Sequence, residues 1–78
     1  MIGPEFEDVL HAAAGGDEEA FGTLWSDLQP RLLRYFKVVA PSVAEDLASE
    51  TWVGVIRGID RFKGGEPAFR AWVFTIAR

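Results

Sequence analysis

The sequence has no cysteine and only one histidine, and this scarcity limits the metal sites and disulfides that the chain can form. Without cysteine the chain forms neither a disulfide framework nor a thiolate metal site. The one histidine, His11, lies in an alanine-rich segment, and no second His or Cys is present to complete a metal site, so we expect no metal site and no cofactor. The carboxylates gather where helices are expected to begin, and no serine has a positioned base. We therefore also expect no enzymatic activity.

Long apolar runs are missing as well. No stretch approaches the roughly 18 residues of a membrane span, and residues 1–6 have neither the basic start nor the apolar run of a signal peptide. Together with the missing cysteine, this predicts a cytoplasmic protein with no membrane partner. Hydrophobic residues still make up 49% of the 78 residues, which favours a compact core over disorder.

Basic residues are absent from the first part of the chain. Residues 1–30 hold seven acidic residues and no Lys or Arg, whereas residues 31–78 hold all eight Lys and Arg against five acidic residues. Such asymmetry is typical of a protein that binds an anionic partner at one end only. Unevenly charged, solvated helix faces explain the same pattern equally well.

Apolar residues recur at helical spacing through most of the chain, and no strand-like alternation appears. A short helix over residues 7–14 ends at two glycines, and Asp17 then caps a second helix over residues 18–38. The apolar stripe of the second helix keeps its phase across Pro30, which predicts one bent helix rather than two. The stripe comprises Phe21, Leu24, Trp25, Leu28, Leu32, Tyr35, Phe36 and Val39.

Two more helices complete the predicted fold. Ser42 and Glu45 have the spacing of a capping box at the start of a third helix over residues 43–59. A glycine-containing loop then leads through Pro67 to a fourth helix that begins near Ala68 and buries part of its aromatic content. The predicted fold class is all-α, a compact bundle of three main helices plus a short N-terminal helix.

The chain is expected to contain one domain. We set residues 1–6 aside as a tag remnant or a disordered N-terminus, because residues 3–6 are typical of a cloning scar. The domain then spans residues 7–78. The apolar pattern of the fourth helix is still running at Arg78 with no capping residue, so we expect the domain to be C-terminally truncated.

The third helix has a polar face that its own packing does not require. Asp46, Ser49 and Glu50 are three and four residues apart and share this face, with Ile56 at its edge. An acidic face of this kind suits a basic protein surface, although a solvated helix face fits the spacing equally well. The opposite, apolar face comprises Ala44, Leu47, Ala48, Thr51, Trp52, Val55 and Ile59.

The last segment mixes cations with aromatic side chains over a short span, a composition typical of proteins that bind single-stranded nucleic acid. The competing interpretation is that most of these aromatics belong to the core, since Phe69 and Trp72 follow helical spacing. Phe62 then covers the core as a lid, and Phe74 remains unassigned. The mixed residues are Arg61, Phe62, Lys63, Arg70, Trp72, Phe74 and Arg78.

Three segments resemble one protein family. Residues 44–52, A-E-D-L-A-S-E-T-W, resemble the region-two signature A-E-D-L-x-Q-E-T-F of the extracytoplasmic-function (ECF) sigma factors of the sigma-70 family. Residues 69–78, F-R-A-W-V-F-T-I-A-R, are similar to that family's F-R-A-W-L-x-x-I-A-R-N, and residues 20–35 resemble its region 2.1. The resemblance covers about residues 17–78, and two motifs at the expected separation are far more specific than either alone.

The resemblance implies a subunit for transcription initiation without catalytic activity. It implies that Asp46, Ser49, Glu50 and Ile56 bind the clamp helices of the largest subunits of core RNA polymerase. It also implies that the loop before the fourth helix captures a base flipped from the non-template strand of the promoter minus-ten element, and that the fourth helix contacts the same strand. The DNA-binding residues would be Arg61, Phe62, Lys63, Gly64, Gly65, Arg70, Phe74 and Arg78.

Some positions depart from the family pattern. Ser49 stands where the family usually has Gln, and Trp52 replaces the usual Phe. The Asn and the basic stretch that normally follow Arg78 are missing. The acidic balance and the missing basic tail favour a second hypothesis, in which the chain is a protein-interaction module bound by an anti-sigma factor and has no DNA role.

Overall fold

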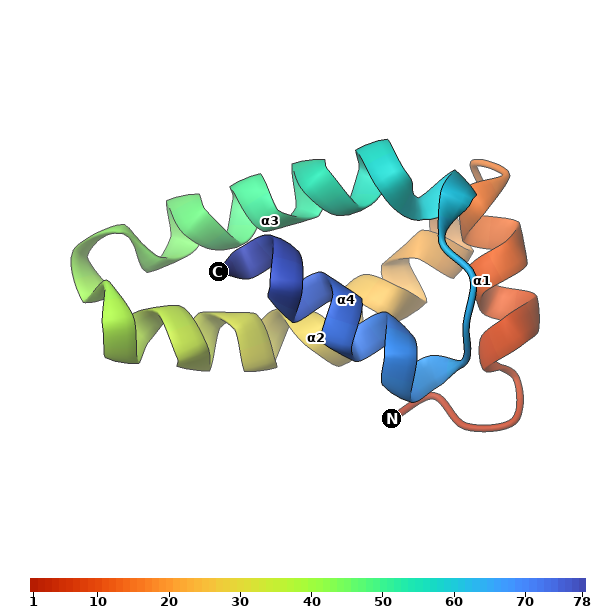
Figure 1. The fold of residues 1–78 in the computed structure, drawn as a ribbon, viewed down its shortest axis with the longest axis horizontal. Helices are drawn as coiled ribbons and strands as arrows, with labels where there is room; N and C mark the ends of the chain where they lie inside the picture. The colour runs from red at the N-terminus through yellow and green to blue at the C-terminus, as the bar shows by residue number, and fades with distance from the viewer.

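The computed structural model describes residues 1–78 and consists of helices and short turns without any strand (Figure 1). The predicted all-α fold is therefore confirmed. None of the helices combines the length and the apolar character that crossing a membrane requires. The elements are α1 (Phe6–Ala14), α2 (Glu18–Val39), the 3-10 turn η1 (Pro41–Val43), α3 (Ala44–Gly58), the 3-10 turn η2 (Ile59–Arg61) and α4 (Glu66–Ala77).

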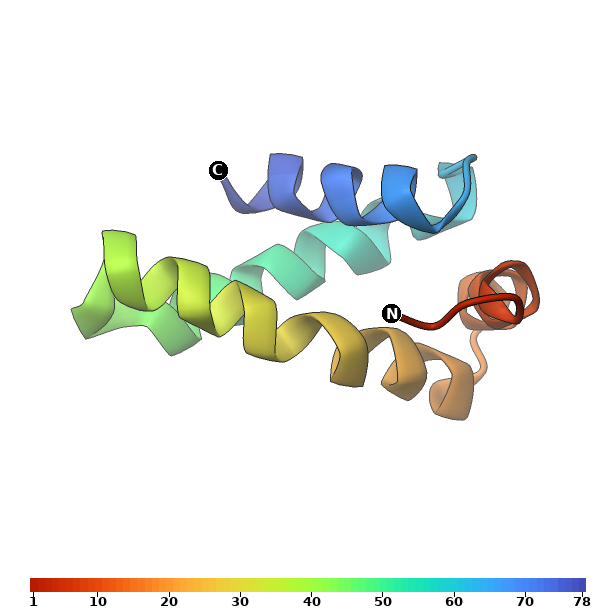
Figure 2. The ribbon, with the colours of Figure 1, turned by 90° about the horizontal axis from the view of Figure 1, so that it is seen from below.

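The helices form a bundle 35 Å long. The two longest, α2 and α3, run in opposite directions along this axis, and α4 packs across them (Figure 1). Figure 2 shows α1 end-on, so α1 lies crosswise at the end of the bundle where α2 begins. This arrangement leaves one side of α3 and the start of α4 facing solvent.

The second helix forms largely as predicted. The Asp17 carboxylate accepts a hydrogen bond of 2.8 Å from the Ala20 amide, which caps the helix, and the helix continues through Pro30 without interruption. Two residues of the predicted apolar stripe are substantially exposed in the structure. Trp25 is 44% exposed and Val39 is 57% exposed.

The capping box predicted at the start of α3 is wrong. Residues 41–43 form a 3-10 turn, in which the Val43 amide donates to the Ala40 carbonyl, so Val43 rather than Ser42 precedes the helix. Ser42 is exposed and its hydroxyl makes no hydrogen bond to α3. The proline locks its own φ and favours the tight turn, which moves Ser42 one residue too far from the helix start.

The fourth helix crosses α3 at close range, and two glycines allow it. A Cβ at Gly54 would lie 2.7 Å from Ile76 Cγ2, and one at Gly58 would lie 2.8 Å from Trp72 Cζ2. The helix begins at Glu66, two residues earlier than predicted, and Pro67 occupies its first turn. Leu24, Leu28, Leu32, Val55, Phe69 and Val73 are the largest fully buried side chains and form the centre of the core.

Candidate functional site

The solvent-facing side of α3 carries the residues predicted to bind a protein partner. We call Asp46, Ser49, Glu50, Val53 and Ile56 the α3 outer face; all five are exposed. None of the ion pairs within the chain involves them, and the polar side chains among them make no hydrogen bond. The two carboxylates are therefore free to bind cations from outside the chain.

Apolar side chains complete this surface. Val53 is 45% exposed and Ile56 is 58% exposed, beside the two carboxylates. The sequence interpretation missed Val53, although it lies three residues after Glu50 and four after Ser49 and so must share their face. Acidic and aliphatic groups on one helix face suit a protein surface that offers both cations and apolar contacts.

The loop between α3 and α4 presents cations around a strained glycine. Arg61, Lys63, Gly64 and Gly65 are all exposed. Gly64 has φ +147°, and a Cβ there would lie 3.0 Å from Ala68 Cβ and 3.1 Å from the ring of Phe62. The loop conformation therefore depends on glycine at this position.

Aromatic packing holds the predicted DNA-binding aromatics in place. Phe62 lies edge-on to Phe69 at a ring-centroid distance of 5.4 Å and against Trp72 at 5.1 Å, and it is half-buried. Phe74, also half-buried, packs edge-on against Tyr35 at 6.0 Å. Phe62 thus covers the core as a lid, and both rings are largely occupied by contacts within the chain.

The side chain of Arg70 points into a network of acidic groups rather than outward. We call Asp27, Glu66, Arg70 and the backbone of residues 1–3 the α4 corner. The guanidinium of Arg70 lies 3.5 Å from the Asp27 carboxylate and 3.9 Å from the Glu66 carboxylate, and its Nε is buried without a hydrogen-bond partner. These contacts hold Arg70 against α2 and leave little of it for an external phosphate.

Residues 1–3 complete the α4 corner. The Ile2 and Gly3 amides donate to the Glu66 carboxylate at 2.6 and 2.9 Å, and the Met1 ammonium donates to Asp27. Phe6 is buried, with its ring centroid 5.6 Å from that of Phe69. Sequence reasoning missed these contacts because residues 1–6 were set aside. The apolar Ile2 and Phe6 on either side of the Gly3-Pro4 turn are the one local signal of packing.

The two carboxyl groups of the α4 corner stay ionised more readily than usual. Burial by itself raises the pKa of Glu66, but the Ile2 and Gly3 amides and the Arg70 charge outweigh it, so the pKa lies below the ordinary 4.5. Burial also acts to raise the pKa of Asp27, and the Met1 ammonium and Arg70 outweigh it, placing the pKa below the ordinary 3.8.

The structure thus separates the predicted DNA-binding residues into two groups. Arg61, Lys63, Gly64 and Gly65 lie together at the start of α4, and Arg78 is exposed at its other end, about 18 Å away for a helix of 12 residues. Phe62 lies within the loop, and Arg70 and Phe74 lie on α4; all three side chains contact other parts of the chain.

Comparison with known proteins places this arrangement in a family. The family Sigma-70 region 2 matches residues 24–78. The ECF RNA polymerase sigma factor BldN of Streptomyces coelicolor is 36% identical over 73 residues, covering 91% of this chain and 28% of the relative. The ECF RNA polymerase sigma factor ShbA of Streptomyces griseus is 34% identical over 76 residues, covering 88% of this chain and 40% of the relative.

The chain spans less than half the length of these curated relatives. No solved structure matches it. The family match covers α3, the loop and α4 completely, together with most of α2. The α3 outer face and the loop before α4 therefore both lie inside the matched residues. The chain therefore belongs to the sigma-70 region 2 family, and among its members it is similar to ECF sigma factors.

Proposed function

We propose that this chain is the region-two domain of an ECF sigma factor in transcription initiation, which docks on core RNA polymerase through the α3 outer face. The observation that carries the proposal is the pair of exposed, unpaired carboxylates of Asp46 and Glu50 on a helix whose opposite face is buried. Free carboxylates beside the exposed Val53 and Ile56 form a surface complementary to a basic, partly apolar helix pair. The clamp helices of the polymerase are the partner implied by the family.

Binding to the isolated clamp-helix module of the polymerase tests this docking. The double variant Asp46→Lys, Glu50→Lys is expected to lose at least about tenfold in affinity, because two attractive charges become repulsive at the interface. The matched control is Glu7→Lys, Asp8→Lys, which makes the same charge change on the exposed face of α1. If both double variants bind as well as the parent, the docking assignment is wrong.

We further propose that the loop and α4 hold the non-template strand of the minus-ten element. Arg61, Lys63 and Arg78 offer exposed cations for phosphates, and Gly64 and Gly65 let the backbone approach a base that has left the stack. In this proposal three of the predicted residues do not contact DNA but hold α4 and the loop in position, namely Phe62, Arg70 and Phe74. Capture of an unstacked base by this surface would contribute to opening the promoter.

A second candidate function is that of a protein-interaction module, sequestered by an anti-sigma factor and without DNA binding of its own. It is favoured by the net charge of −4 and by the burial of Arg70 among carboxylates, which leaves few free cations near α4. Affinity for a single-stranded minus-ten oligonucleotide at low and high salt separates the two functions. DNA binding predicts an affinity that falls with salt, whereas no binding at low salt supports the interaction module.

A further inference from the structure

The first six residues of the chain pass alongside the start of α4 (Figure 1), and we call residues 1–6 the N-terminal strap. The Ile2 and Gly3 amides donate to the carboxylate of Glu66, which is the first residue of α4. The residue before this helix, Gly65, has no side chain, and α4 begins without a side-chain cap. The start of α4 is therefore held by a segment that is distant in the sequence rather than by a cap of its own.

Aromatic packing links the N-terminal strap to the loop before α4. Phe6, at the end of the strap, is buried, and its ring centroid lies 5.6 Å from that of Phe69. The Phe69 ring also contacts Phe62 of the loop, at a centroid distance of 5.4 Å. Because Phe69 contacts both rings, a displacement of the first turn of α4 changes the support of the loop.

The backbone of the loop fits closely against the same turn. A Cβ at Gly64 would lie 3.0 Å from Ala68 Cβ and 3.1 Å from the ring of Phe62. Gly64 and Gly65 have no side chains with which to anchor the loop, and glycine has more conformational freedom than any other residue. The conformation of the loop therefore depends on where Ala68 and Phe62 are held.

We propose that the N-terminal strap is a positioning element for the DNA-binding loop, because it holds Glu66 and Phe69 where the loop can accept an unstacked base. This inference rests on the proposed function of the loop and adds a segment that contacts no DNA. Loss of the strap should impair recognition of the base more than the contacts with phosphates. The exposed side chain of Lys63 is long and flexible, so it reaches a phosphate from a displaced loop as well.

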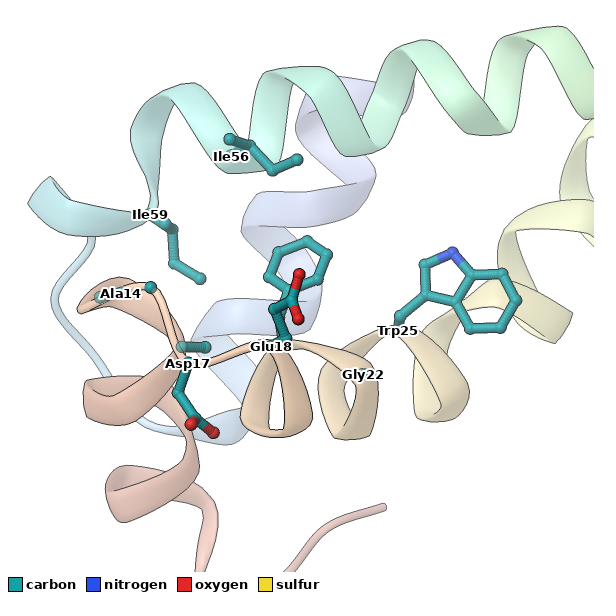
Figure 3. Close-up of a pocket in the computed structure, with 10 residues that line it drawn as sticks. Ala14, Asp17, Glu18, Gly22, Trp25, Ile56 and Ile59 are labelled. Carbon is teal, nitrogen blue, oxygen red and sulfur yellow. The ribbon is translucent and has the colours of Figure 1, made fainter.

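The variant Gly3→Val tests the strap without a change in the core. Gly3 has φ +88°, at which a β-branched residue is strained, and a Cβ there would meet no atom within 4 Å. The strain should turn the strap amides away from the start of α4. The matched control is Gly16→Val, since Gly16 has φ +98° and equally open surroundings. Gly16 lies at the other end of α1, in the turn between Ala14 and Asp17 (Figure 3).

Amide hydrogen exchange reports whether the strap holds α4. The Phe69 amide donates to the Gly65 carbonyl at 2.9 Å, a hydrogen bond that closes the first turn of the helix. Its exchange rate is compared with that of amides at the centre of α2, which report unfolding of the whole chain. This ratio should rise at least about fivefold in Gly3→Val and stay within about twofold of the parent in Gly16→Val.

Binding of single-stranded minus-ten oligonucleotides reports whether the strap positions the loop. Each base is removed in turn, and loss of the captured base should lower the affinity of the parent at least about fivefold, the effect of one lost stacking contact. In Gly3→Val this difference should shrink to about twofold or less, while affinity for the abasic oligonucleotide stays near that of the parent. Unfolding would instead lower the affinity for both oligonucleotides equally, and Gly16→Val should retain the full difference.

Two results overturn the proposal. If the exchange ratio in Gly3→Val matches that of the parent, or rises equally in both glycine variants, the strap does not hold the start of α4. If the ratio rises but removal of the captured base costs Gly3→Val as much as it costs the parent, the strap holds α4 without positioning the loop.

A failure of the proposed function gives a different result. If the parent binds intact and abasic oligonucleotides equally, capture of a base by the loop is wrong. The exchange ratio, which is measured without DNA, still decides whether the strap holds the start of α4.

Discussion

The α3 outer face and the α4 corner each contain two carboxylates, yet they differ in what surrounds those groups. Asp46 and Glu50 are exposed and have no partner in the chain. Glu66 is 8% exposed, and its carboxylate accepts two backbone amides and lies near Arg70. Carboxylates of the second kind stabilise the fold, whereas those of the first kind remain available to a partner.

The largest effect that separates the two regions is on stability. Replacing Glu66 by Ala leaves two amide donors and the Arg70 side chain without their acceptor, at an expected cost of about 1–3 kcal/mol in the free energy of unfolding. Glu50→Ala, the matched control on α3, should change it by no more than about 0.5 kcal/mol. Urea denaturation measures both, and equal losses would remove the distinction between the regions.

Acid should lower the stability of the chain through the α4 corner. Because the pKa values of Glu66 and Asp27 lie below their ordinary 4.5 and 3.8, ionisation of both groups favours the folded state. Their contribution is complete above about pH 5 and is lost as the pH falls through the lowered pKa values. The free energy of unfolding, measured in urea from about pH 6 down to 3, should therefore fall with decreasing pH.

The variant Glu66→Gln provides the control for this pH dependence. It keeps the size of the side chain but cannot titrate, so its free energy of unfolding should fall less steeply with acid than that of the parent. An unchanged slope would mean that Glu66 is not the group that titrates. Asp27 remains in the variant and accounts for the slope that persists.

Local sequence was sufficient to predict the helices, because their signals lie within a few residues of each other. Asp17 caps the helix that follows it directly, and the stripe around Pro30 was correctly interpreted as one helix. The capping box at Ser42 failed for an equally local reason, since Pro41 draws Ser42 into a 3-10 turn. The all-α class follows from the same periodicity.

The arrangement of the candidate sites depended on residues far apart in the chain. Asp27 lies 43 residues before Arg70, and Ile2 lies 64 residues before Glu66, so no spacing rule predicts that they meet. The exposure of Trp25 depends on where α1 and α3 stop covering α2. By contrast, the α3 outer face lies on a single helix, which is why helical spacing placed Asp46, Ser49 and Glu50 together on its exposed side.

Two cations near α4, Lys63 and Arg70, differ in whether they are free to bind phosphate. Lys63 is exposed, so Lys63→Met should lower the slope of log affinity against log salt for a single-stranded oligonucleotide by about 0.7. Arg70 is held by Asp27 and Glu66, so Arg70→Met should leave this slope unchanged while it lowers the stability. A slope that falls equally in both variants would show that Arg70 leaves the α4 corner to bind phosphate.

The smallest expected effect is at Ser49, the one polar residue of the α3 outer face that carries no charge. Its side chain is exposed and unpaired, and it stands where the resemblance to ECF sigma factors leads one to expect Gln. Ser49→Gln lengthens the side chain and adds a donor and an acceptor, which should raise affinity for the clamp-helix module by about two- to tenfold, the effect of one added hydrogen bond. The stability should stay within about 0.5 kcal/mol of the parent, because the side chain is exposed and makes no hydrogen bond within the chain. Gln at the exposed Thr23 of α2 is the control, and an equal gain there would mean that the effect is not specific to the α3 outer face.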